Sequence, residues 1–326
     1  MFQIEPILWL QSFESPILTT LMATVSSLGY SVVYGTLIIV LVFGFNFKKG
    51  LFLFLLMFIG GILTHGLKSG LKLPRPSDID IRINEPNRAA SQKLVEMGGA
   101  DSFWSLPSSG AMAAVKIQND WSYGFPSGHV SAAAVFFLGL FFFFRKKGML
   151  LFALSWVLLM ALSRMYLGRH FVADVLGGIV VAGVAILIGF FLLRPLKMED
   201  SKAPNGKAFL RLTGFALTLV FLTPFIEILD ADNIGRLAGI IVAYYFTTKI
   251  ALSSDQGTIW QRLGRILVAV IMFFVTNQLI SNIMDSMAWE DIRWLSLIAS
   301  FLIISLPFIA AFTISSRLNL YIVEER

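Results

Sequence analysis

The chain consists of long apolar runs separated by shorter polar segments. Nine of the runs have about the length that a helix needs to cross a bilayer, roughly 17–25 residues. They cover residues 28–46, 51–67, 129–144, 149–167, 171–193, 208–228, 234–250, 264–284 and 294–314. The pattern predicts an all-α protein, a polytopic membrane helical bundle with about nine transmembrane helices. Residues 2–27 include Trp9, Glu5, Glu14 and two prolines, which favours an amphipathic helix at the membrane interface over a tenth span.

Composition supports a membrane protein and limits its chemistry. The chain is 56% hydrophobic and 14% charged, whereas a soluble domain is about 45–50% apolar and about 25% charged. It contains no cysteine, which excludes disulfides, zinc–thiolate sites, iron–sulfur clusters and thiol nucleophiles. The net charge of +6 comes mainly from short basic connections between apolar runs. Such connections reflect membrane topology, so we expect no nucleic-acid partner.

The same basic connections predict the orientation in the membrane. Lys and Arg in short loops mark the cytoplasmic side, and they gather in the connections 46–50 and 145–148 and in the linker 194–211. These three segments lie on one side when the nine runs alternate across the bilayer. We therefore predict a multi-pass protein of the cytoplasmic (inner) membrane, with its amino terminus outside and its carboxyl terminus inside. The long polar stretch 68–125 then faces the extracytoplasmic side.

Three polar patches adjoin the apolar runs, and all of them fall on the predicted outer side. They read KSGLKLPRP at 68–76, FPSGH at 125–129 and SRMYLGRHFVAD at 163–174. A charged residue in the apolar part of a membrane costs about 2.5–3.5 kcal/mol on insertion scales. Several charges at one depth therefore predict a functional site.

The residue types in these patches suit the binding of a phosphate. Lys68, Arg75 and Arg164 are cations that only donate hydrogen bonds, and a guanidinium fork matches two phosphate oxygens. Ser127 and Gly128 directly precede a predicted helix. They supply a capping hydroxyl and a backbone that can approach a ligand closely, at the helix end that favours anions.

The histidines suit two different roles. His170 and Asp174 are four residues apart and share a helix face, so the carboxylate can hold one imidazole N–H and leave the other nitrogen free to attack. His129 begins another helix at the same predicted depth and can protonate a departing oxygen. The other cationic or imidazole side chains nearby are interpreted as loop, headgroup or structural groups: Lys72, Arg169 and His65.

In their order and spacing, Lys-x6-Arg-Pro, Pro-Ser-Gly-His and Ser-Arg-x5-His-x3-Asp, the patches resemble the three-part signature of the type 2 phosphatidic acid phosphatase superfamily. The resemblance covers roughly residues 28–193. It implies an enzyme with a helical-bundle active site, a phosphohistidine intermediate, and neither a metal nor another cofactor. The substrates that it implies are lipid phosphomonoesters or diphosphates, such as phosphatidate, phosphatidylglycerol phosphate or undecaprenyl diphosphate. It assigns His170 as nucleophile, Asp174 as its partner, His129 as general acid, and Lys68, Arg75, Ser127, Gly128 and Arg164 as phosphate-binding residues.

The resemblance also divides the chain. Residues 1–193 are expected to form the lipid phosphatase core of about five spans, 194–207 a cytoplasmic linker, and 208–326 a four-span extension that the signature does not cover. Two hypotheses for the extension are a homodimer formed through its spans and a lipid entry path or partner site; the alternative is added helical packing. Within the core, the loop before Pro126 is longer than expected. We predict a short helix over 88–97 ended by Gly98-Gly99, and a lid that includes Phe103, Trp104, Trp121 and Tyr123.

Two other activities fit some of these observations. A lipid phosphotransferase would share the phosphohistidine step and pass the phosphoryl group to another lipid. A lipid transporter or flippase would account for many spans with intramembrane charge. A transporter is expected to carry its charges near the membrane midplane in two related halves, whereas here the charges lie at one edge and in one half of the chain.

Overall fold

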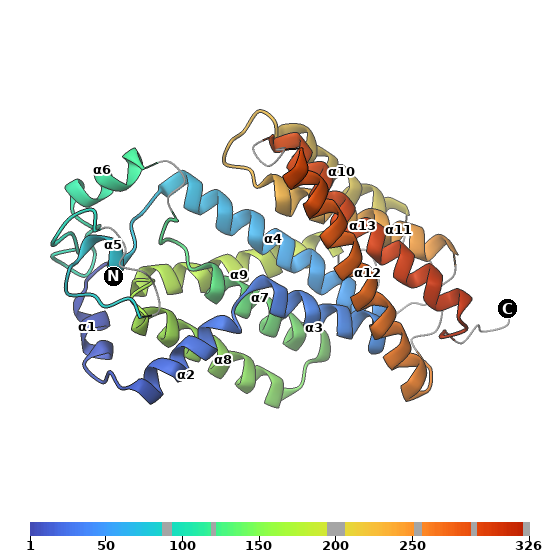
Figure 1. Ribbon diagram of the computed structural model, residues 1–326, viewed down its shortest axis with the longest axis horizontal. Coiled ribbons are helices and arrows are strands. Elements are labelled where there is room, and N and C mark those ends of the chain that lie inside the picture. Colours follow the sequence, from blue (N-terminus) through green and yellow to red (C-terminus); the bar gives the residue numbers. More distant parts are fainter. Residues whose placement is uncertain (87–92, 119–121, 194–205, 251–255, 288–291, 322–326) are drawn as a thin grey trace. The chain divides into compact units, whose positions relative to one another are not determined.

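The structure is a computed structural model that describes residues 1–86, 93–118, 122–193, 206–250, 256–287 and 292–321. These residues form α-helices and no strand, apart from one isolated antiparallel bridge between Asp80 and Met97. The helices, labelled in Figure 1, are α1 (Glu5–Gln11), α2 (Pro16–Ser27), α3 (Ser31–Gly44), α4 (Phe47–Leu71), α5 (Pro76–Ile79), α6 (Ser109–Ile117), α7 (Gly128–Phe144), α8 (Lys147–Tyr166), α9 (Val172–Leu193), α10 (Gly206–Leu222), α11 (Ala231–Ile250), α12 (Ile259–Ser286) and α13 (Arg293–Arg317).

The predicted all-α membrane bundle is confirmed, although a count of nine spans is not. Each of the nine predicted spans coincides with a helix. Five segments of the described chain are long and apolar enough to cross a membrane: Phe47–Ile79, Lys147–Tyr166, Val172–Leu192, Ile259–Ser286 and Arg293–Arg317. A sixth span results if α2 and α3, which meet at an angle of 55°, form one broken span. Helix α7 and the segment Leu210–Leu222 of α10 are apolar but shorter.

The amino-terminal segment differs from the single interfacial helix that we predicted. It folds into α1 and α2, because Ser15 accepts a hydrogen bond from the backbone N–H of Leu18 and Pro16 occupies the first helical position, a combination that starts a new helix. Helix α2 then packs against α8. At least α2 of this segment is therefore packed into the helical bundle.

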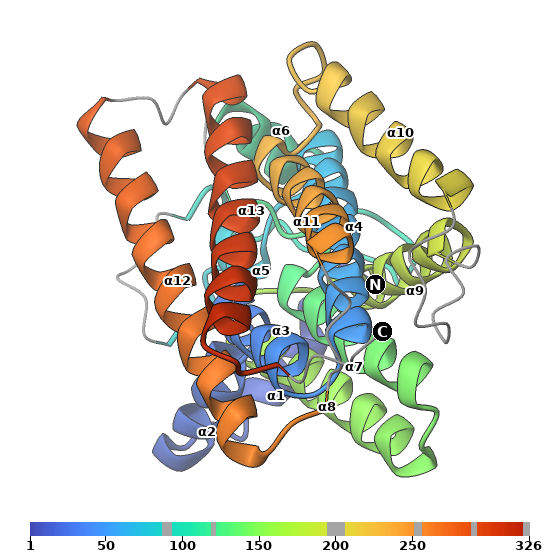
Figure 2. The same ribbon diagram turned by 90° about the vertical axis from the view of Figure 1, so that its right-hand side faces the viewer.

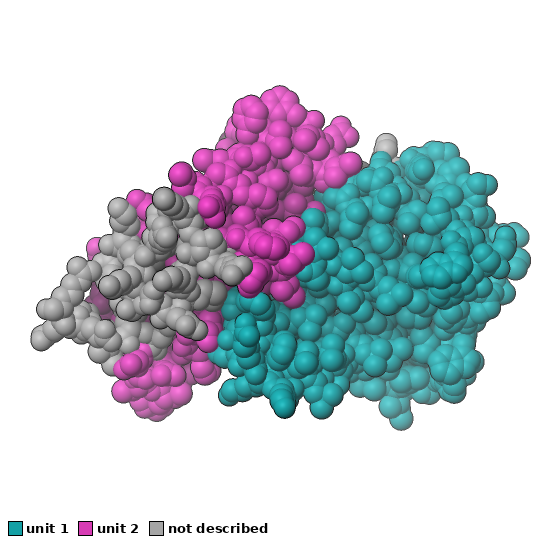
Figure 3. All heavy atoms as spheres, turned by 180° about the vertical axis from the view of Figure 1, so that it is seen from behind, with its two compact units in different colours: residues 1–34, 63–185 teal, residues 35–62, 186–326 magenta. Residues whose placement is uncertain are grey.

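The chain divides into two compact units (Figure 3). The first contains Met1–Tyr34 and Leu63–Ala185, and the second contains Gly35–Ile62 and Ile186–Arg326. All three sequence motifs belong to the first unit. The predicted division into 1–193, 194–207 and 208–326 stays a prediction, and residues 194–205 of the linker lie outside the described residues.

In the first unit, α7 and α8 form an antiparallel hairpin with a very short connection. Arg145 adopts the left-handed conformation that ends α7, and Lys146 directly precedes α8. The start of α7 and the end of α8 must then lie at the same end of the hairpin. A five-residue turn leads from α8 into α9, so the start of α9 lies at that end too. This is the arrangement that the ends of the apolar runs predicted.

The polar stretch after α4 folds around a small hydrophobic cluster at this end of the first unit. Figure 1 shows α1, α5 and α6 there. The cluster contains Phe2, Ile4, Ile7, Leu73, Ile79, Ile83, Ala100, Ala111, Phe171 and Ala173. The ring of Phe2 lies against those of Phe171 and Phe125, with centroid distances of 5.5 and 6.4 Å. Because Phe125 and Phe171 belong to two of the polar patches, this cluster supports the backbone of the motif residues.

The helix predicted over 88–97 is not formed in its described part, residues 93–97; residues 88–92 lie outside the described residues. Backbone pairing with the segment after α5 accounts for the difference. The N–H of Leu94 donates to the Asp78 carbonyl, and that of Gly98 to the Ile79 carbonyl. In the other direction, the N–H of Ile81 donates to the Glu96 carbonyl. These long-range bonds satisfy backbone groups that a local helix would have used.

The second unit has its densest packing among its last three helices. Helix α11 packs extensively against α13, and α12 packs against α13, as Figure 2 shows. Phe308 of α13 is fully buried, with aromatic neighbours at centroid distances of 5.2 Å for Phe43, 5.9 Å for Phe47 and 6.1 Å for Phe273. A buried aromatic cluster of this kind gives the unit a core of its own.

Candidate active site

Four helix ends of the first unit carry the predicted site residues except Arg75, which directly precedes α5. Lys68 lies in the last turn of α4, and Arg164 lies in the last turn of α8. Ser127 is the residue before α7, and His170 and Asp174 lie on either side of the start of α9. The sequence folds in this way because each motif stands where an apolar run begins or ends. The motifs are therefore brought to one end of the unit by the helices themselves.

His170 and Asp174 form a buried pair. The Nδ1 atom of His170 lies 3.2 Å from Oδ2 of Asp174, and the same oxygen accepts the backbone N–H of Phe171 at 3.0 Å. Their side chains are only 2% and 0% exposed. A carboxylate that engages Nδ1 favours the tautomer with the proton on Nδ1, which leaves a lone pair on Nε2. The geometry that the four-residue spacing predicted is present.

The electrostatic environment of His170 favours its neutral form. Burial, reinforced by the positive charges of Arg164, Lys68 and Arg75, lowers the pKa of His170 well below its ordinary value. Desolvation and like charges both act against the protonated ring. A neutral imidazole with a free Nε2 is the form that can act as a nucleophile.

The turn before α7 is attached to the start of α9. The backbone N–H of Ser127 donates to the Asp174 carbonyl at 2.8 Å. Gly178, one turn further along α9, lies so close to this turn that a Cβ atom there would be 2.8 Å from the Ser127 carbonyl oxygen. The Ser127 hydroxyl is buried and has no hydrogen-bond partner among the residues that the structure describes. Its hydrogen-bonding capacity is therefore not used by the described residues.

Lys68 and Arg75 both donate hydrogen bonds to the segment 122–124, which leads into the Pro-Ser-Gly-His motif. The ammonium group of Lys68 donates to the carbonyls of Tyr123 and Gly124 at 2.6 and 3.1 Å. Arg75 donates through Nε to the Ser122 carbonyl at 2.7 Å and through Nη2 to the Ser122 hydroxyl at 2.6 Å. The two cations thereby fix this segment as well as placing positive charge in the site.

Arg164 has a partner that the sequence did not reveal. Its Nη1 atom donates to the hydroxyl of Ser26 in α2 at 2.5 Å. The guanidinium is buried, and its Nε has no partner within the described chain. Ser26 belongs to the amino-terminal segment, for which we predicted only an interfacial role, and no sequence signal connects it to a motif 138 residues away.

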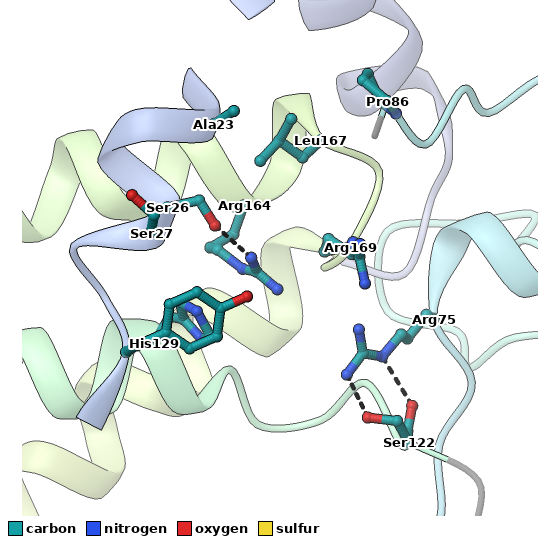
Figure 4. Close-up of a pocket in the computed structure, with 11 residues that line it drawn as sticks. Ala23, Ser26, Ser27, Arg75, Pro86, Ser122, His129, Arg164, Leu167 and Arg169 are labelled. Carbon is teal, nitrogen blue, oxygen red and sulfur yellow. Dashed lines mark hydrogen bonds between the residues drawn. The ribbon is translucent and has the colours of Figure 1, made fainter. Parts of the chain in front are cut away.

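A cavity of about 420 Å³ opens beside these groups (Figure 4). Of the predicted site residues, Arg75, His129 and Arg164 line it, whereas Lys68, Ser127, Gly128, His170 and Asp174 do not. The Nε2 atom of His129 is buried without a partner among the described residues, and the ring packs edge-on against Tyr30 at 5.0 Å between centroids. The lining residues are Ala23, Ser26, Ser27, Tyr30, Arg75, Pro86, Ser122, His129, Arg164, Leu167 and Arg169.

Arg169, which we interpreted as a loop or headgroup charge, lines this cavity. Its Nε lies 2.5 Å from Oε1 of Glu85, whose side chain is 5% exposed. Its position directly before His170 is the signal that could have pointed to it. Of the residues predicted to form a lid, Phe103 and Trp104 are exposed, and Trp121 lies outside the described residues. Their role as a lid stays a prediction.

Among the described residues, no group of three or more His, Asp or Glu side chains could hold a metal ion. The groups that gather around the cavity are instead cations, hydroxyls and an imidazole. Such a set suits an anion with several oxygen atoms, and a phosphate group in particular.

Comparison with known proteins agrees with this chemistry. The model of the PAP2 superfamily matches residues 49–198. A curated relative, the lipid A 4'-phosphatase of Bacteroides thetaiotaomicron, is 26% identical over 123 residues, which are 37% of this chain and 49% of that protein. The chain thus spans about half the length of this relative, and no solved structure matches it. The matched region contains all three motifs and every helix end that carries them, so residues 49–198 are similar to the PAP2 superfamily in the part of the chain that forms the site.

Proposed function

We propose that the protein is an integral membrane phosphatase that removes phosphate from a lipid phosphomonoester or diphosphate through a phosphohistidine intermediate, without a metal. The observation that carries this proposal is the buried pair of His170 and Asp174. A neutral imidazole is held there by one nitrogen, close enough to Arg164, Lys68 and Arg75 for their charges to act on it. Nucleophile and phosphate-binding cations therefore stand together.

In the first step, Nε2 of His170 attacks phosphorus and the bond from phosphorus to the lipid oxygen breaks. His129 donates a proton to that oxygen, so the lipid leaves as an alcohol, or as a monophosphate when the substrate is a diphosphate. The imidazole of His170 carries positive charge in the phosphohistidine, and the Asp174 carboxylate stabilises it through Nδ1–H.

In the second step, water attacks phosphorus and gives a proton to His129. The bond between phosphorus and Nε2 breaks, inorganic phosphate leaves, and both histidines return to their starting states. Charge builds up on the phosphoryl oxygens in both steps. Lys68, Arg75, Arg164 and the groups at the start of α7 are placed to stabilise that charge without reorganising.

Several observations support a lipid substrate on the outer face. The segments Lys147–Tyr166 and Val172–Leu192, whose ends carry Arg164 and Asp174, are long and apolar enough to span a membrane. The curated relative is by name a lipid A 4'-phosphatase. Phosphatidate, phosphatidylglycerol phosphate, undecaprenyl diphosphate and lipid A are the substrate candidates that we propose to test. The basic connections 46–50 and 145–148 favour an active site facing away from the cytoplasm.

The test is a phosphate-release screen with purified protein in detergent over these lipid phosphates, with and without EDTA. We expect release from at least one lipid, undiminished by EDTA, and none from the His170→Gln variant. Brief incubation with 32P-labelled substrate followed by alkaline denaturation should leave label on the wild-type protein only. Release by His170→Gln at the wild-type rate would contradict the proposal. Label transferred to an added lipid alcohol instead of water would identify a phosphotransferase.

A further inference from the structure

The cavity is lined by one arginine more than the two that we assigned to the phosphate that is removed. Three arginines line it, Arg75, Arg164 and Arg169, and none of the described lining residues is a carboxylate. Arg75 and Arg164 stand in motifs assigned to the phosphate that is removed. Figure 4 shows the Arg169 guanidinium directed into the same space from the opposite side to Ser122. This third cation has no role in the steps described above.

We propose that Arg169, held in place by Glu85, binds a second phosphate group of the substrate, so that the preferred lipid carries two phosphates in its headgroup. The inference rests on the proposed function and deepens it. It names a specificity-determining residue, whereas the chemistry remains with His170 and His129.

The ion pair of Arg169 and Glu85 is held in place by the residues around it. An exposed ion pair contributes little to stability and has no fixed geometry. The Glu85 side chain, however, is only 5% exposed. The neighbouring Asn84 is anchored to Gln11 of α1: its carbonyl accepts the Gln11 amide N–H at 2.6 Å, and its own N–H donates to Gln11 Oε1 at 3.1 Å. Glu85 is thus presented from a fixed backbone.

The backbone beneath Arg169 is equally constrained. Gly168 has a φ of +68°, and a Cβ atom there would lie 2.7 Å from the Asn84 carbonyl oxygen. Only glycine combines this conformation with so close an approach. Gly168 also accepts the backbone N–H of Ser77 at 3.1 Å. The position of Arg169 relative to the cavity is therefore determined by contacts on both sides of the ion pair.

The pair leaves part of the Arg169 guanidinium for a ligand. Glu85 engages Nε, and a guanidinium has five N–H donors in a fork that suits phosphate oxygens. Holding the side chain at Nε reduces the entropy lost when the terminal nitrogens bind. Arg75 and Arg164, by contrast, already donate to Ser122 and Ser26.

The size of the cavity and its number of guanidinium groups favour a headgroup with two phosphates. A cavity of about 420 Å³ corresponds to roughly 14 times the volume that a water molecule occupies in the liquid, which exceeds the needs of one phosphate. A phosphomonoester carries a charge of about −1.5 to −2 at neutral pH. The three lining arginines and nearby Lys68 carry four positive charges, of which the Glu85 and Asp174 carboxylates offset two. Net charge is therefore matched by one phosphate, and it is the number of guanidinium donors in the cavity that a second phosphate would use.

Two kinds of lipid provide this chemistry. In a lipid diphosphate the two phosphates share an oxygen, and the internal phosphate is part of the leaving group, which His129 faces from the same cavity. In phosphatidylglycerol phosphate, a glycerol separates them. Phosphatidate carries one phosphate and serves as the reference.

The first experiment measures binding without turnover. We would determine dissociation constants for methylphosphonate, methylenediphosphonate and propane-1,3-bisphosphonate with the wild-type protein and with Arg169→Gln, Arg169→Lys and Arg82→Gln. Arg82 pairs with Asp80 outside the cavity and is the matched control. The wild type and Arg82→Gln should bind one bisphosphonate at least 10-fold more tightly than methylphosphonate. Arg169→Gln should lose this advantage, and Arg169→Lys should retain part of it. Tighter binding of methylenediphosphonate would indicate a lipid diphosphate as substrate, and tighter binding of propane-1,3-bisphosphonate would indicate two phosphates separated by a glycerol.

The second experiment compares kcat/KM for a short-chain prenyl diphosphate, a short-chain phosphatidylglycerol phosphate and a short-chain phosphatidate. Arg169→Gln should lower kcat/KM 10- to 100-fold for the preferred two-phosphate lipid and less than 3-fold for phosphatidate. An equal loss on all three lipids, or a wild type without a bisphosphonate preference, would overturn the inference. Bisphosphonate preference without any phosphate release would instead overturn the proposed function and leave the second phosphate site standing.

Discussion

At the scale of single residues, Asp174 connects three parts of the site. Its Oδ2 atom accepts from the Phe171 N–H and engages His170 Nδ1, and its backbone carbonyl accepts from the Ser127 N–H. The carboxylate therefore sets both the orientation of the imidazole and the tautomer. The backbone contact ties it to the start of α7. A change confined to the side chain separates the first role from the second.

We predict that Asp174→Asn retains the fold and loses most of the activity. An amide oxygen in the place of Oδ2 can still accept both the Phe171 N–H and the Nδ1–H of His170. The amide is uncharged, however, so it no longer stabilises the positive charge that the imidazole carries once it has attacked phosphorus. The analogous change in a serine protease lowers kcat about 10⁴-fold, and we expect a loss of 10²- to 10⁴-fold here. Phosphate release measures it, with the exposed Asp101→Asn as the matched control. Near-normal turnover of Asp174→Asn would show that the carboxylate is dispensable.

A second prediction concerns the pH dependence of stability. Burial and the charges of Arg164, Lys68 and Arg75 lower the pKa of His170 in the folded protein, whereas it is about 6.5 in an unfolded chain. Below pH 6.5 the unfolded state therefore binds a proton that the folded state does not. The free energy of unfolding should fall as the pH decreases from 6.5 towards the lower folded pKa, by up to about 1.4 kcal/mol per pH unit.

Thermal unfolding in detergent between pH 7.5 and 5 tests this, because glutamine does not titrate. His170→Gln should lose stability less steeply than the wild type as the pH falls, and the exposed His65→Gln should follow the wild type. Parallel curves for His170→Gln and the wild type would mean that His170 titrates alike in both states.

At the scale of helices, the contact between α9 and the turn before α7 determines where Ser127 stands. We predict that Gly178→Ala lowers kcat at least 10-fold, because the new Cβ would lie 2.8 Å from the Ser127 carbonyl oxygen and 3.1 Å from the Ser131 nitrogen. Neither is a flexible side-chain end, so the turn must move. Gly183→Ala on the same helix is the control, since its Cβ would meet nothing within 4 Å. Equal kcat values for the two variants would show that the turn tolerates displacement.

The helices also show what the sequence could predict. The ends of the apolar runs placed Lys68, Ser127, Arg164 and His170 at helix ends, because membrane-spanning length determines where such helices stop. The features that the sequence did not predict depend on contacts between distant segments. They are the hydrogen bond between Arg164 and Ser26, the ion pair between Arg169 and Glu85, and the backbone pairing that replaces a helix before Gly98. None of these has a local pattern, and each requires the tertiary fold.

At the scale of the whole molecule, the motif-bearing unit and the carboxyl-terminal helices pose different questions. The first unit contains the cavity and all the predicted site residues. In the second, the most apolar window of α12 is only 6% buried within the described chain. Lipid or another protein must cover a surface of this kind in a membrane. A homodimer through these helices stays a prediction, and its test is the oligomeric state in detergent.

The last prediction is the orientation of the whole chain. Lys and Arg gather in the connections 46–50 and 145–148 and in the linker 194–211, and basic short loops remain in the cytoplasm. The opposite ends of the helices, with the motifs, should then face outward. Lys68 and Arg75 add positive charge to the predicted outer side. We do not count them as topology signals, because they belong to the proposed phosphate site.

Single cysteines test the orientation cleanly, since the chain has none of its own. Ser108→Cys, exposed at the start of α6, should react with a membrane-impermeant maleimide in intact spheroplasts. Ser201→Cys, in the linker, should react only after lysis. The reverse pattern would place the site in the cytoplasm and direct the search for substrates to lipids of the inner leaflet. Labelling of both cysteines in spheroplasts would mean that the helices do not alternate as the loops predict.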